Sequence, residues 1–64
     1  MNTEIERIIL QIYLMGLVGS TLDILTDYSS ITGVLIEVKF DYIILRQSNN
    51  FFYIPLAQIK SVAK

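Results

Sequence analysis

Hydrophobic residues near the start of the chain recur at helical spacing and predict one α-helix over residues 3–16. They fall on two stripes, with Ile5, Ile8, Ile9, Ile12 and Met15 on the first and Leu10, Leu14 and Leu17 on the second. Polar residues cover only a narrow part of this helix, although a helix with one exposed side needs a single apolar face. We therefore expect one stripe to pack on the rest of the chain and the other to contact a partner chain.

Both ends of the predicted helix carry local signals. Thr3 and Glu6 have the spacing of a capping box, in which each side chain accepts a hydrogen bond from the backbone N–H of the other residue. Gly16 and Gly19 follow the apolar stripes, and either can adopt the left-handed conformation that ends many helices. The helix is thus predicted to end near Gly16.

The rest of the chain alternates between β-type runs and turn residues, which predicts five short strands. Their expected ranges are 20–26, 31–40, 42–47, 51–54 and 59–62, with a 3₁₀ turn at 56–58. The longest strand is expected to alternate strictly along residues 31–40, with Val34, Ile36 and Val38 on one face, and Gly33 lets it bend or bulge near its start. The spacing favours a mainly β fold, in which an N-terminal helix precedes a five-stranded small barrel at residues 20–63 of one domain at 1–64.

Turn residues separate these strands, and three turns are candidate ligand loops because functional side chains often lie on loops. Asparagines tolerate a positive φ, so they are expected to form the turn at residues 48–50. The candidate ligand-loop residues are Tyr28, Asp41, Tyr42, Asn49 and Asn50. Aromatic residues at 42 and 51–53 could stack nucleic-acid bases, but core or subunit-interface positions are the commoner use of such residues.

Composition favours self-association. A chain of 64 residues has room for a core worth only roughly 3–5 kcal/mol. The sequence is 53% hydrophobic and contains no Cys and no His, so disulfides cannot stabilise it and a zinc site is not expected. Association with partner subunits is the remaining way to stabilise a chain of this size. The residues expected at the oligomer interface are Ile5, Ile8, Ile12, Leu10, Leu14, Leu17, Phe52 and Ile54.

Charge and side-chain chemistry argue against catalysis and against nucleic acid. The net charge is −1, and the five cations are scattered along the chain, which does not suit a phosphate backbone. Without His or Cys, no familiar pair of nucleophile and base can form. The carboxylates at 23, 27, 37 and 41 occupy outward strand or turn positions and are interpreted as solvated surface. We expect no enzyme activity, no cofactor and no metal.

No membrane span or secretion signal is expected. Glu4 and Glu6 occupy the segment that a signal peptide fills with cations. The apolar run at 8–18 contains Gln11 and is far shorter than the ~20 residues of a membrane-spanning helix. A cytoplasmic protein is the expectation.

The order of helix, five strands and 3₁₀ turn resembles the Sm-like (LSm) fold, an SH3-like small barrel whose members include Hfq. The residues that carry this resemblance are Val18-Gly19-x-x-Leu22, Ile31-Thr32-Gly33-Val34-Leu35, Phe40-Asp41 followed by Ile43-Ile44-Leu45, and Phe52-Tyr53-Ile54 leading to Ile59 and Val62. More closely, the pattern is similar to a family of small proteins of spore-forming bacteria, some of them spore-coat-associated. Membership there implies an Sm-like barrel without known catalysis and a link to the spore coat.

One departure from the Hfq pattern bears on RNA. Where Hfq has Tyr-Lys-His before the last strand, this chain has Tyr53-Ile54-Pro55, which lacks the cation and the imidazole that would contact RNA. Pro55 also lacks the amide donor for pairing between subunits. The expected function is a homo-oligomeric structural or interaction module, with other spore or cytoplasmic proteins as further partners. The alternative is an RNA-binding regulator of the Hfq type.

Overall fold

A computed structural model describes residues 3–64, with side chains from Glu4 onward. One helix, α1 (Thr3–Met15), precedes all the strands. The strands are β1 (Thr21–Thr26), β2 (Ser30–Val38), β3 (Tyr42–Gln47), β4 (Asn50–Pro55) and β5 (Ile59–Ala63), with a 3₁₀ turn, η1 (Leu56–Gln58), between the last two. The predicted elements are all present, and their bounds differ by at most two residues. The predicted capping box depends on the side chain of Thr3, which lies outside the described side chains.

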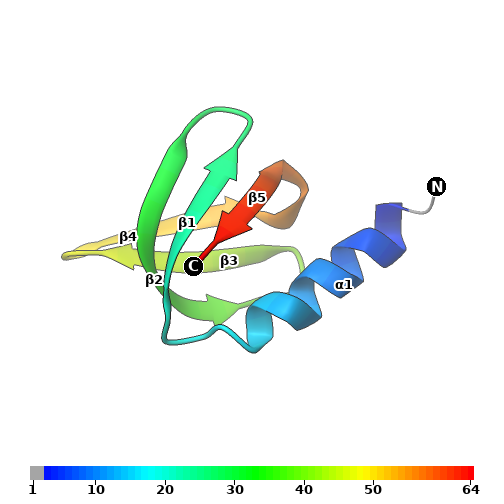
Figure 1. The fold of residues 1–64 in the computed structure, drawn as a ribbon, viewed down its shortest axis with the longest axis horizontal. Helices are drawn as coiled ribbons and strands as arrows, with labels where there is room; N and C mark the ends of the chain where they lie inside the picture. Colours follow the sequence, from blue (N-terminus) through cyan, green and yellow to red (C-terminus); the bar gives the residue numbers. More distant parts are fainter. Residues whose placement is uncertain (1–2) are drawn as a thin grey trace.

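The five strands form one antiparallel sheet in the order β4-β3-β2-β1-β5. Each strand pairs with its sequence neighbour, except that β5 returns to pair with β1 rather than with β4. Figure 1 shows that β2 curves, so that the β1–β2 hairpin stands across the direction of β3 and β4. The structure therefore confirms a mainly β fold with an N-terminal helix and a five-stranded sheet, whose edges are β4 and β5.

One side of the curved sheet, together with the inner face of α1, encloses the core. Its buried side chains come from the helix and four of the five strands, with η1 adding one more: Leu14, Leu22, Ile24, Leu35, Ile43, Leu45, Ile54 and Leu56. In β1 the side chains alternate, with Leu22 and Ile24 inward and Thr21 and Asp23 outward. The helix completes the core at one side of the sheet, and its N-terminal turn extends away from the strands (Figure 1).

Strand β2 departs from the predicted strict alternation. Leu35 pairs with Leu45 and Glu37 with Ile44, so the register shifts between Leu35 and Glu37. This bulge changes which face the following residues occupy, and Val38 packs against the core while Val34 lies on the other side, partly buried. The prediction that residues 32, 34, 36, 38 and 40 share one face was therefore wrong, because an extra residue interrupts the alternation.

Gly33 lies at a close approach of β2 to β3, and the bulge itself is three residues further on. A Cβ placed on Gly33 would lie 2.7 Å from the backbone oxygen of Arg46 in β3. That separation is too short for carbon and oxygen that are not bonded, so only glycine fits without movement. Gly33 therefore allows the close approach of β2 to β3, while the bulge predicted near Gly33 lies at Ile36 instead.

Two turns contain a residue in the left-handed conformation; the first is one of the two glycines predicted for it, and the second is not the residue type expected. After α1, Gly19 has a φ of 93°, whereas Gly16 has an ordinary φ. In the β3–β4 turn the positive φ of 56° belongs to Ser48 rather than to an asparagine. Because only the first of the two turn residues has a positive φ, the turn matches type II′.

Candidate functional site

The outer side of α1 carries the largest exposed apolar surface on the helix. Its five side chains are exposed by between 46% (Ile8) and 64% (Ile12). We call this surface the isoleucine face, which consists of Ile5, Ile8, Ile9, Ile12 and Met15. The opposite side of the helix packs on the sheet through Leu10, Leu14 and Leu17, of which Leu14 is 0% exposed. The two predicted stripes are thus separated, and the leucines are the ones that face inward.

Two polar contacts fix the helix on the sheet. Gln11 Nε2 donates a hydrogen bond to the backbone oxygen of Lys39, at 2.9 Å. The guanidinium carbon of Arg7 lies 5.7 Å from the centre of the Phe40 ring, within the range of a cation–π contact. Both contacts reach the β2–β3 connection from the side of α1 that faces the sheet. The helix is therefore held in one orientation, with the isoleucine face outward.

The predicted interface residues divide between the surface and the core. Ile5, Ile8 and Ile12 are exposed on α1, whereas Ile54 is only 4% exposed and belongs to the core. Phe52 is half-buried and packs against the same core. The surface available to a partner is therefore the isoleucine face rather than the leucine stripe or the inner residues of β4.

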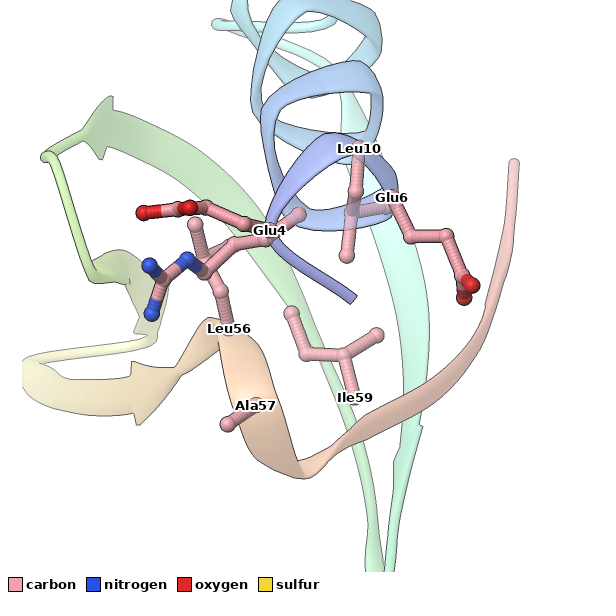
Figure 2. Close-up of a pocket in the computed structure, with 7 residues that line it drawn as sticks. Glu4, Glu6, Leu10, Leu56, Ala57 and Ile59 are labelled. Atoms are coloured by element: carbon pink, nitrogen blue, oxygen red, sulfur yellow. The ribbon is translucent and has the colours of Figure 1, made fainter. Parts of the chain in front are cut away.

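A pocket of about 650 Å³ lies on the sheet-facing side of α1, between the N-terminal half of the helix and the segment that contains η1. Its lining residues are Glu4, Glu6, Arg7, Leu10, Leu56, Ala57 and Ile59. In Figure 2, Glu4 and Glu6 extend to opposite sides of the opening, and Leu10, Leu56 and Ile59 lie between them. The pocket thus has an apolar floor and a charged rim. It can accept an apolar group, but its lining holds no imidazole or thiol for nucleophilic chemistry.

A second exposed apolar surface lies on the outer side of β3 and β4. The rings of Tyr42 and Tyr53 are 5.9 Å apart at an angle of 45°, and Tyr53 is 65% exposed. Phe51 is also exposed and lies opposite Arg46 in the strand register. Of the four aromatic residues considered for base stacking, three share this outer face, while Phe52 points to the core.

The predicted ligand loops do not come together into one site. Tyr28, which is 81% exposed, lies at the β1–β2 turn, and Asn49 lies at the β3–β4 turn. The two hairpin tips point in different directions (Figure 1). Asp41 and Tyr42 lie at the other end of β3 from Asn49 and Asn50. The Tyr28 turn is well ordered, because Thr26 Oγ1 accepts hydrogen bonds from the backbone N–H groups of Tyr28 and Ser29.

Three of the five cations lie beside a partner group. Lys39 Nζ is 2.7 Å from Glu37, and Lys60 Nζ is 3.4 Å from Asp27. The third is Arg7, which lies over the Phe40 ring. The hydrogen bond to Glu37 and the negative charge of its carboxylate raise the pKa of Lys39 above its ordinary value. These pairings reduce the positive charge that the surface offers to an anionic ligand.

Within residues 3–64, no three acidic side chains gather closely enough to hold a metal ion. Across the same residues, no helix is both long and apolar enough to cross a bilayer.

Comparison with known proteins identifies the protein family of this chain. A family model described as a domain of unknown function, DUF2642, matches residues 1–63, which is nearly the whole chain. The chain belongs to the DUF2642 family. No curated protein and no solved structure was found to match this DUF2642 chain.

Several features of this DUF2642 domain had no local signal in the sequence. The contacts of Arg7 with Phe40 and of Gln11 with Lys39 join residues about thirty positions apart. The pocket residues Leu56, Ala57 and Ile59 also meet α1 only through the fold. The isoleucine face, by contrast, could be found from the spacing of its residues alone.

Proposed function

We propose that this protein is a non-enzymatic module that assembles with further copies of itself and serves a structural or protein-interaction role. The observation that carries the proposal is the isoleucine face, because five large apolar side chains lie together on a helix whose other side already packs on the core. Contiguous apolar surface of this kind marks interaction sites on small proteins. Covering a half-exposed isoleucine is worth about 1 kcal/mol, half of the value for full burial.

An Sm-like small barrel is the fold proposed for this module. The strand order β4-β3-β2-β1-β5, the curved β2 and the close approach at Gly33 support it. Placement in the spore coat is proposed on the sequence resemblance alone. It is tested by whether an antibody against the protein labels the coat fraction of purified spores.

The mass of the protein in solution tests self-assembly directly. We expect sedimentation equilibrium at low micromolar concentration to give a multiple of the chain mass of 7.3 kDa. Association should weaken on dilution, since it is a mass-action equilibrium. A constant 7.3 kDa species across the micromolar range would refute the proposed assembly.

RNA binding is the second candidate, because the exposed Tyr53, the partly buried Tyr42 beside it and Phe51 opposite Arg46 form a surface on which bases could stack. The charge pattern opposes it, since Lys39, Lys60 and Arg7 lie beside partners and the chain has a net charge of −1.

We expect no binding of A-rich or U-rich oligonucleotides tighter than the ~10⁻⁴–10⁻⁶ M of non-specific contacts at physiological salt. Fluorescence anisotropy checks this, with Tyr53→Ala as the matched variant. Nanomolar binding that Tyr53→Ala abolishes would make RNA recognition the function instead.

A further inference from the structure

The isoleucine face has the spacing of a coiled-coil seam. Ile5, Ile8, Ile12 and Met15 follow one another at intervals of three, four and three residues, which are the a and d positions of a heptad pattern. Ile9 widens the seam on one side. All five side chains are about half-exposed or more. Side chains in this pattern interdigitate well with a second helix that has the same pattern.

The helix offers this seam in a fixed orientation. Leu10, Leu14 and Leu17 occupy the opposite side and pack against the core. The Gln11 hydrogen bond and the Arg7–Phe40 contact hold the helix on the β2–β3 connection. Little conformational freedom is therefore lost when a partner covers the seam, which favours association.

We infer that the occupant of the seam is α1 of a second copy, which runs antiparallel to the first across a two-fold axis. This inference rests on the proposed self-assembly and names its interface. In this arrangement Ile8 lies opposite Ile12 of the partner copy and Ile5 lies opposite its Met15. A two-fold interface makes each of these contacts twice, so the one seam is complementary to itself.

Charge decides the direction of the two helices. Glu4 and Glu6 lie in the first turn of α1, and the last turn carries no basic residue. A parallel pair would bring the first-turn glutamates of both copies together. An antiparallel pair centred on residue 10 separates the two copies of Glu4 by ~18 Å and the two copies of Glu6 by ~12 Å along the helix axis. Both separations exceed the Debye length of ~8–10 Å at physiological salt, so screening weakens the repulsion.

Charge also favours a second copy over a lipid surface. Helices that lie on anionic membranes carry several lysines or arginines on their polar side. Between Glu4 and Met15, α1 has two glutamates and a single cation, Arg7, which contacts Phe40. The seam is therefore suited to an apolar protein surface rather than to anionic headgroups.

Engineered cysteines test this pairing cleanly, because the native chain has none. A disulfide needs Cα atoms within about 7 Å. In the antiparallel pair, residue 5 is close to residue 15 of the partner copy but ~15 Å from residue 5 of that copy. The double variant Ile5→Cys/Met15→Cys should therefore form a covalent dimer on mild oxidation. The single variants Ile5→Cys and Met15→Cys should each give at least tenfold less covalent dimer than the double variant. Tyr28→Cys, at an exposed turn, measures the background yield of random cross-linking, and the single variants should not exceed it.

The outcomes separate this inference from the proposed assembly. Self-linking of the two single variants as efficiently as the double variant would mean parallel helices and overturn the inference. A protein that sediments as an oligomer but links only at the Tyr28→Cys background uses another interface, which overturns the inference and leaves the assembly proposal standing. A monomer at every concentration overturns both. Cosedimentation of a monomer with phosphatidylglycerol vesicles would identify the seam as a membrane surface and also overturn the inference.

Discussion

Replacing Gly33 by alanine is expected to lower the free energy of unfolding by about 1–3 kcal/mol, the usual cost of overpacking a tight site. The added Cβ would lie 2.7 Å from the backbone oxygen of Arg46 and 3.2 Å from its carbonyl carbon. A backbone group that is held in the β2–β3 pairing cannot rotate away as a flexible side chain can. The added methyl group is therefore expected to strain the pairing of β2 with β3.

Gly16→Ala is the matched control for this change. The same methyl group at Gly16 meets its nearest atom at 3.5 Å, an ordinary contact, and the φ of Gly16 is not left-handed. This variant should be neutral or more stable by up to ~1 kcal/mol, because alanine restricts the unfolded chain. The urea midpoints of Gly33→Ala, Gly16→Ala and the native protein are compared at one fixed protein concentration. Equal midpoints for Gly33→Ala and the native protein would contradict the close approach of β2 to β3.

Leu14→Ala is expected to destabilise the chain by about 2–5 kcal/mol, as buried leucine truncations generally do. Leu14 is 0% exposed and joins α1 to the core of the sheet. Since a domain of this size has roughly 3–5 kcal/mol in total, the variant should be largely unfolded at room temperature. Circular dichroism measures the lost structure.

Ile12→Ala removes an apolar side chain of similar size from the other side of the same helix, where it is 64% exposed. We expect the isolated chain to fold nearly as well as the native one. The native thermal midpoint should rise with protein concentration, because assembly stabilises the folded state, and Ile12→Ala should weaken that dependence. If Ile12→Ala were as damaging as Leu14→Ala at the lowest concentration, the assignment of the two helix faces would be reversed.

Local sequence patterns were sufficient to predict the helix, the strands and the turns. The spacing of Leu22 and Ile24 reflects a short-range constraint, and the structure agrees with it. The two stripes on α1 were also evident from spacing. The spacing did not show which stripe faces inward, because leucines and isoleucines have similar hydrophobicity and the choice depends on the shape of the sheet.

The remaining differences come from contacts between distant residues. The bulge in β2 lies at Ile36 because of how β2 aligns with β3, and no single-strand pattern encodes that alignment. Ser48 takes the left-handed position because a two-residue turn joins Gln47 to Asn50 in this register. The candidate ligand loops could be identified as turns, but their separation in space depends on the curvature of the whole sheet.

The return of β5 to β1 has a consequence for how the chain folds. The other three strand pairs are hairpins between sequence neighbours, whereas Ile24 pairs with Val62 across most of the chain. Closing a loop of this length costs about 3 kcal/mol in its length-dependent entropy alone. The β1–β4 meander can therefore form first, and β5 docks after its partner strand is in place. In native-state hydrogen exchange, the amides of β5 are accordingly expected to exchange before those of β2 and β3.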